Sequence, residues 1–169
     1  MDPDTVLRVA HDQAMQYPSV AVGHPFGPEY TVYKVRGRMF MMAYELRGTP
    51  SLNLKIDPLD GEVLRDAYAE ITPGYHMNKL HWITVAGAGA STEAGASTDA
   101  GGTGAARDTG AARDTGVARD AGIAGEGVRL DAELLHDLVL ESYCLVVAKL
   151  ARKDRPVDPV SFGGRDLEE

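Results

Sequence analysis

The chain of 169 residues is poor in cysteine, lacks long apolar runs and has no excess of basic side chains. Its one cysteine, Cys144, cannot form an internal disulfide or supply a cysteine-rich zinc site, which excludes the secreted disulfide scaffold and the zinc finger. No run of about 18 apolar residues occurs, so we expect no transmembrane helix and no membrane partner. The N-terminal segment MDPDTVLRV lacks the basic and then apolar order of a secretory signal. These absences favour a cytoplasmic protein.

The charge balance is acidic, with 17 lysine and arginine residues against 25 aspartate and glutamate residues and a formal net charge of −8. Because nucleic-acid-binding domains usually carry a basic surface, this balance argues against such a domain. The acidity is unevenly distributed, however. Without residues 87–127 and 156–169, 114 residues remain, with 13 basic and 15 acidic side chains and a net charge of −2. The objection from charge is therefore weaker for the body of the chain than for the whole.

Residues 87–127 contain a repeat in which glycine recurs every six positions, in the units GASTEA and GASTDA from Gly89 and, after a three-residue interruption, GAARDT, GAARDT, GVARDA and GIAGEG from Gly104. Of these 41 residues, 23 are Gly or Ala, and only Val117 and Ile123 are larger apolar groups. Such a segment buries too little apolar surface to offset an ordering entropy of roughly 1–2 kcal/mol per residue. We predict a single domain over 1–155, interrupted by this disordered insertion and followed by a flexible acidic tail at 156–169. A passive linker is the favoured interpretation, and a regulated docking arm is the alternative.

The rest of the chain has the periodicities of an α+β domain. Three helices are predicted, each preceded by an aspartate that can cap it: one from Asp2 or Asp4 to about Tyr17, one after Asp57, and one after Asp131. Strand patterns cover Tyr30–Val35, Met39–Leu46, Leu52–Ile56 and His81–Val85, with a further short strand near Val20–Val22. We expect an antiparallel sheet with the helices packed on one face.

Three finer predictions follow from the same patterns. Arg36-Gly37 is a tight-turn signal that joins the first two long strands into a hairpin. The alternation in Leu52–Ile56 predicts a sheet with one packed face and one wet face. In the second helix, Leu59, Val63, Ala67 and Tyr68 share one helical face, which we take to be its apolar side.

Few residues are of the types that carry out chemistry. Cys144 lies in the apolar stretch of the last helix, which indicates a buried structural thiol. His76 and His81 are five positions apart, so they do not share a helical face, and a metal site there would need other ligands. The sequence contains neither a glycine-rich phosphate loop nor a nucleophile elbow. We therefore expect no catalytic residue, no metal, no cofactor and no enzyme activity; an enzyme or small-ligand binder around the two histidines is the least supported class.

One segment, PGYHMNKLHW from Pro73 to Trp82, concentrates polar and aromatic groups. These residue types stack on bases, donate hydrogen bonds and pair with phosphate. A purely structural interpretation competes with this one: Met77 and Trp82 can be core anchors, Asn78 can fix a turn, and Lys79 can be solvated. The candidate site residues in the segment are Tyr75, His76, Asn78, Lys79, His81 and Trp82.

Four segments resemble the MmcQ/YjbR family, and they follow that family's order. They are PFGPEYTVYKVRGRMF from Pro25, LNLKIDP from Leu52, PGYHMNKLHW from Pro73, and SYCLVVAKL from Ser142. Together they account for nearly all of the chain outside the repeat and the tail. The resemblance implies a frataxin-like (CyaY-like) two-layer sandwich and a DNA-binding function of the double-wing type. The long repeat departs from the family, which usually has a short connection at that place.

The resemblance implies a DNA-binding protein and, since catalytic motifs are lacking, we expect a non-enzymatic one with a regulatory role. Its candidate DNA contacts are those of the PGYHMNKLHW segment, to which we add Arg36 and Arg38 at the predicted hairpin tip. The alternative is a protein-interaction or regulatory adaptor that binds an unidentified protein, without nucleic acid. That adaptor would use the sheet or the basic end of the last helix, Lys149 to Arg155.

Overall fold

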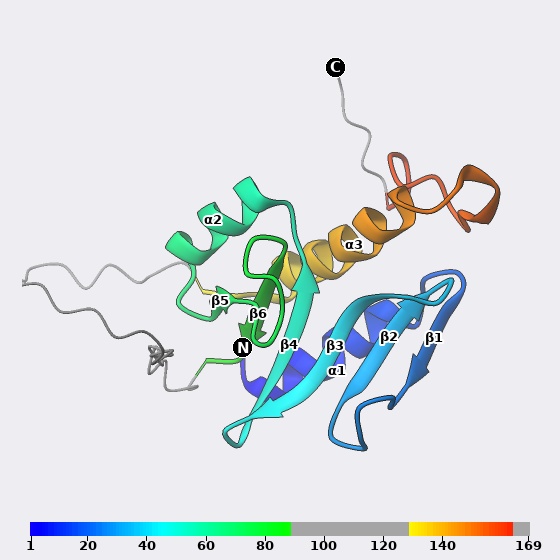
Figure 1. The fold of residues 1–169 in the computed structure, drawn as a ribbon. Helices are drawn as coiled ribbons and strands as arrows, with labels where there is room; N and C mark the ends of the chain where they lie inside the picture. The colour runs from blue at the N-terminus through cyan, green and yellow to red at the C-terminus, as the bar shows by residue number, and fades with distance from the viewer. Residues whose placement is uncertain (89–128, 164–169) are drawn as a thin grey trace, which may run out of the picture.

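A computed structural model describes residues 1–88 and 129–163 (Figure 1). The elements in chain order are α1 (Pro3–Ala14), β1 (Val20–Gly23), β2 (Thr31–Val35), β3 (Arg38–Leu46), β4 (Thr49–Lys55), α2 (Pro58–Ala67), β5 (Ile71–Pro73), β6 (Trp82–Ala86), α3 (Ala132–Ala148) and a 3-10 helix (Arg152–Asp154). The strands form one antiparallel sheet in the order β1-β2-β3-β4-β6-β5. The predicted α+β class is confirmed. Most of the predicted insertion, residues 89–127, lies outside the described residues.

The three predicted helix caps are present. Asp2 accepts a hydrogen bond from the Thr5 amide at 2.9 Å, and Asp131 accepts one from the Leu134 amide at 2.8 Å. Asp57 accepts one from the Leu59 amide at 3.0 Å, with Pro58 as the first helical residue. Each carboxylate satisfies an amide that the first helical turn leaves without a partner, which is why the helices start where the sequence indicates. None of the described helices is long and apolar enough to cross a membrane.

Two hairpin turns of the same kind join β2 to β3 and β3 to β4. Arg36-Gly37 has φ values of 48° and 79°, and Arg47-Gly48 has φ values of 51° and 81°. Positive φ at both central residues is the geometry of a type I′ turn, whose twist matches that of the flanking strands. Because one turn precedes β3 and the other follows it, the two turns lie at opposite ends of the sheet.

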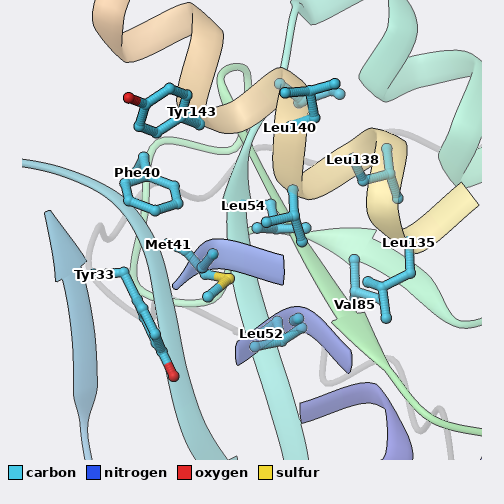
Figure 2. Packing of buried hydrophobic residues seen from close by; sticks show 14 of the residues in the cluster. Tyr33, Phe40, Met41, Leu52, Leu54, Val85, Leu135, Leu138, Leu140 and Tyr143 are labelled. Carbon is cyan, nitrogen blue, oxygen red and sulfur yellow. The ribbon is translucent and has the colours of Figure 1, made fainter. Parts of the chain in front are cut away.

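The main core lies between one face of the sheet and helices α1 and α3 (Figure 2). Phe40 and Tyr143 meet edge to face there, with ring centroids 5.5 Å apart. Phe40 is the extra residue of a β-bulge, since Tyr33 pairs with Met41 while the next residue of β2 pairs with Met39. One side of α3, which includes Leu135, Val139, Tyr143 and Val147, is buried in this core. The helix side of the predicted sandwich is therefore confirmed.

The second face of the sheet is not wet, which corrects the sequence prediction. Ser51 and Asn53, two of the polar residues that alternate with the apolar ones in β4, are buried, and so is Thr84 of β6. A second apolar cluster of Val32, Met42 and Tyr44 lies on this face, with Met77 of the loop between β5 and β6 packed against it. The loop folds over this part of the sheet. Strand periodicity records only which residues share a face and cannot reveal that a distant loop covers it.

Helix α2 has the predicted start but not the predicted orientation. Leu59 and Val63 are 74% and 66% exposed, whereas Gly61 is buried. A Cβ atom at Gly61 would lie 2.9 Å from Cγ2 of Ile56, so only glycine allows this close approach. The helix therefore packs through its glycine face and turns its apolar pair outward.

The ends of the predicted insertion and tail also differ from expectation. The Ala88 amide donates to the Met1 carbonyl at 2.7 Å, which ties the start of the predicted insertion to the N-terminus. Phe162 packs against Tyr17 and Tyr143, with centroids 5.7 Å apart in both pairs. Residues 156–163 are thus part of the packed body, because an aromatic side chain anchors them. The remaining residues of the predicted tail, 164–169, lie outside the described residues.

Candidate functional site

The loop of residues 74–81, between β5 and β6, is held on the sheet by a buried polar network. The Tyr75 amide donates to Thr84 Oγ1 and Asn53 Nδ2 donates to the Tyr75 carbonyl, both at 2.9 Å. Thr84 Oγ1 in turn donates to Asn53 Oδ1 at 2.7 Å, and the Tyr44 hydroxyl donates to the same oxygen at 3.0 Å. Both backbone groups of Tyr75 are therefore satisfied by side chains of β4 and β6.

Several of the sequence-predicted site residues serve the loop itself. Asn78 Oδ1 accepts from the Leu80 amide at 2.9 Å, and the Asn78 carbonyl accepts from the His81 amide at 3.1 Å. Trp82 is only 8% exposed, and a Cβ atom at Gly74 would lie 2.7 Å from its Cβ. Asn78 thus fixes a turn and Trp82 packs, as the structural interpretation of the segment predicts, and His81 is half-buried beside them.

The loop exposes five side chains to solvent, those of Tyr75, His76, Asn78, Lys79 and Leu80. Tyr75 is 39% exposed, and its ring lies 5.9 Å from that of Tyr44 and 4.0 Å from that of His76. These contacts occupy part of the ring surface that a base would need for stacking. His76 has a φ of 54°, a conformation that the clamped neighbouring Tyr75 helps to hold. The loop is built more for hydrogen bonds and charge than for base stacking.

The two predicted arginines lie elsewhere, beside the end of α3. Arg36 and Arg38 are exposed and line a shallow hollow of about 560 Å³ together with Leu150, Ala151 and Asp154. Figure 1 shows the β2–β3 hairpin next to the end of α3, whereas the 74–81 loop lies on the other side of β4. These two arginines, together with the exposed cations that neighbour the lining residues Leu150, Ala151 and Asp154 in the sequence, are called here the basic end. They are Arg36, Arg38, Lys149, Arg152 and Lys153, all of them exposed.

Lys55, at the end of β4, connects the two parts of the predicted site. Its Nζ lies 5.0 Å from the centre of the Trp82 ring, an arrangement suited to a cation–π contact. Partial burial lowers the pKa of Lys55, and the positive charge of Lys149 lowers that pKa further. Lys55 was not predictable as a site residue, because its only signal in the sequence is a polar position in an alternating strand.

The sequence predicts Arg155 as part of the basic end of the last helix, but in the structure its side chain binds backbone carbonyls. Its Nε donates to the Leu150 carbonyl at 3.0 Å and its Nη2 donates to the Ala148 carbonyl at 2.6 Å. The guanidinium thus satisfies carbonyls that the end of α3 leaves open. No group of three or more histidine, cysteine, aspartate or glutamate side chains suited to a metal ion occurs among the residues that the structure describes.

Comparisons with known proteins place the chain in a family. The family model YjbR matches residues 15–99. The uncharacterized protein YbdF of Escherichia coli O157:H7 is 44% identical over 94 residues, which cover 56% of this chain and 77% of that protein. The uncharacterized protein YjbR of Escherichia coli K12 is 38% identical over 55 residues, 32% of this chain and 47% of that protein.

A solved structure supports the fold. The crystal structure of Deinococcus radiodurans protein DR2400, described by the domain DUF419, matches with a TM-score of 0.59 and 28% identity, over 92% of this chain and 86% of that chain. With half of the chain matched by the family model, the protein belongs to the YjbR family, as the four sequence segments predict.

Proposed function

We propose that this protein is a non-enzymatic, regulatory DNA-binding protein that contacts the phosphate backbone with its basic end. The observation that carries the proposal is the position of Arg36 and Arg38 around one hollow with the end of α3, where Lys149, Arg152 and Lys153 are also exposed. Guanidinium and ammonium groups on an exposed turn and helix end are the groups that most often bind phosphate oxygens.

The electrostatics of this region favour an anionic ligand. Partial burial lowers the pKa of Lys55, and the positive charge of Lys149 at the end of α3 lowers that pKa further. A bound polyanion would reduce the repulsion between these two lysines. Pairing of the protein's cations with phosphates would also release counterions from the nucleic acid. The overall charge of −8 does not oppose this, since a local cluster of one sign can orient a ligand on a protein of the other sign.

The 74–81 loop supplies a second contact in this proposal. The β2–β3 hairpin and the loop follow strand ends at the same end of the sheet, with β4 between them. In this proposal the hairpin and the loop would be the two wings of the double-wing arrangement that the family resemblance implies. Lys79 would bind phosphate, and Tyr75 and His76 would donate hydrogen bonds beside it.

The proposal is tested by titrating short duplex and single-stranded DNA with the full chain at two salt concentrations, and with a variant that lacks the glycine repeat. We expect the logarithm of the binding constant to fall by about 0.9 per log unit of salt for each phosphate that is neutralised on duplex DNA. Binding that is absent at low salt, or that does not change with salt, contradicts the proposal. The variant without the repeat shows whether the repeat shields the surface.

One observation favours the alternative, a protein-interaction adaptor without nucleic-acid binding. The apolar pair Leu59 and Val63 of α2 is turned into solvent, and exposed apolar groups on a helix are typical of protein contacts. This alternative predicts no salt-dependent binding of DNA in the same titration.

A further inference from the structure

Helix α2 carries an exposed apolar pair that the proposed DNA contact does not use. Leu59 and Val63 are one helical turn apart and lie on the side away from the buried Gly61. Acidic side chains flank the pair, and Asp60, Glu62 and Asp66 are all exposed. The α2 face, meaning these five residues, therefore combines an apolar centre with a negative border.

The hollow at the basic end has the complementary character. Leu150 and Ala151 are the apolar residues in its lining, and Arg36 and Arg38 contribute guanidinium groups. An apolar side chain with carboxylates on either side matches such a hollow, because the apolar group meets Ala151, the exposed apolar residue of the lining, while the carboxylates meet the arginines. Asp154 also lines the hollow, so the match depends on the two arginines outweighing one carboxylate.

The α2 face cannot reach the hollow of its own molecule. Helix α2 packs against β5 at one edge of the sheet, whereas the hollow lies beside the hairpin of β2 and β3. Strands β4 and β6 separate the two elements in the sheet, and Figure 1 shows α2 and the hairpin on opposite sides of the molecule. A contact between these surfaces therefore needs two molecules.

We propose that the α2 face of one copy docks in the hollow of a second copy of this chain. The contact is head to tail, so each bound pair keeps one free α2 face and one free hollow, and association continues with concentration. Because the contact covers Arg36 and Arg38, it would also compete with an anionic ligand at the basic end. The inference goes beyond DNA binding and does not depend on it.

The experiment measures the mass of the full chain by sedimentation equilibrium over a range of concentrations at low salt. One variant, Leu59→Ser with Val63→Ser, removes the apolar centre of the α2 face. A second variant, Arg36→Asn with Arg38→Gln, removes the charges of the hollow; asparagine tolerates the positive φ at position 36. We expect the mass of the unsubstituted chain to rise with concentration and each variant alone to stay at the mass of one chain.

An equimolar mixture of the two variants gives the sharpest result. The first variant keeps an intact hollow and the second keeps an intact α2 face, so the mixture should form particles of two chains and no larger ones. The control is Val160→Ser, which removes an apolar side chain that is 60% exposed elsewhere and should leave association unchanged. Circular dichroism verifies that each variant is folded.

An unsubstituted chain that stays monomeric at every concentration overturns the inference. So does a variant that associates as well as the unsubstituted chain, or a mixture that forms no pairs. The Leu59→Ser, Val63→Ser variant also separates this inference from the proposed function, because it should lose self-association and keep salt-dependent binding of duplex DNA. A failure of self-association leaves the DNA titration unaffected.

Discussion

At the scale of the residue, Ser142 is the clearest case of one side chain that holds two elements together. It is fully buried in α3, and its hydroxyl donates to the Phe40 carbonyl and accepts from the Lys55 amide at 2.7 Å. The Phe40 carbonyl in the bulge and the Lys55 amide at the end of β4 thereby share a hydrogen-bond partner that comes from α3. The position also fixes how α3 lies on the strands that lead to Arg38 and Lys55.

Replacing this hydroxyl should destabilise the fold. Ser142→Ala leaves a buried carbonyl and a buried amide without their partner, and each such group costs about 1–3 kcal/mol. We expect the free energy of unfolding, measured by urea denaturation, to fall by that order. Ser161→Ala is the control, because Ser161 is exposed and such surface changes stay within about 0.5 kcal/mol. Equal stabilities of the two variants would show that the Ser142 hydrogen bonds contribute nothing.

Buried tyrosines predict how stability depends on alkaline pH. Burial raises the pKa of Tyr33, Tyr44 and Tyr143 from 10.0 to about 12 in each case. Because the folded pKa lies above the unfolded value, the neutral form is favoured in the native state, and stability is fully present below pH 10. It should fall as the pH rises from 10 to about 12. Denaturation at several pH values checks this, and stability that stays constant over that range would contradict it.

Tyr33→Phe provides the matched variant for the alkaline loss. It removes one of the three titrating hydroxyls and the hydrogen bond to His11 Nδ1 at 2.8 Å. The variant should therefore start from a lower stability at neutral pH and lose less stability between pH 10 and 12 than the unsubstituted chain does.

At the scale of the element, α2 shows what residue patterns miss. Its start was predictable, since Asp57 and Pro58 are a cap and a first helical residue. Its orientation was not, because Leu59 and Val63 indicate an apolar inner face while Gly61 determines the closest approach to Ile56. Glycine has no apolar side chain, so hydrophobic periodicity could not indicate that Gly61 lies on the buried face of α2.

The role of Gly61 is testable by adding one methyl group. Alanine in a helix interior is normally more stable than glycine by roughly 0.5–1 kcal/mol. At position 61, however, the new Cβ would lie 2.9 Å from Cγ2 of the buried Ile56, so we expect Gly61→Ala to lower the urea midpoint. Gly23→Ala is the control, since its Cβ would have nothing within 4 Å. A higher midpoint for Gly61→Ala would mean that α2 is free to move away from Ile56.

The sheet was predicted more completely than its surroundings. Hairpin signals and alternation located β1 to β4 and β6, because those strands are regular and their turns carry glycine. Strand β5 was missed, since Ile71–Pro73 is three residues long and ends in proline. The coverage of Asn53 and Thr84 by the 74–81 loop depends on contacts between distant segments, which no local pattern records.

At the scale of the whole molecule, charge is arranged in a way that composition hides. The chain has a net charge of −8, yet five exposed cations gather at the basic end and acidic side chains line α2. The sequence singled out Arg36 and Arg38 with the PGYHMNKLHW segment, but the structure places them beside the end of α3 instead. Only the sheet order reveals which cations are neighbours, because β4 separates the two segments.

The two type I′ turns of β3 allow the most direct test of the basic end as a phosphate contact. Arg36 and Arg47 occupy the same position in matched Arg-Gly turns, at opposite ends of the sheet. The measurement is the salt dependence of duplex DNA binding by the unsubstituted chain, Arg36→Asn and Arg47→Asn. Arg36→Asn should reduce the slope of log binding constant against log salt by about 0.9, the contribution of one phosphate, while Arg47→Asn leaves it unchanged. Equal slopes for the two variants would contradict the proposed phosphate contact at the basic end. So would a failure of the unsubstituted chain and of both variants to bind DNA.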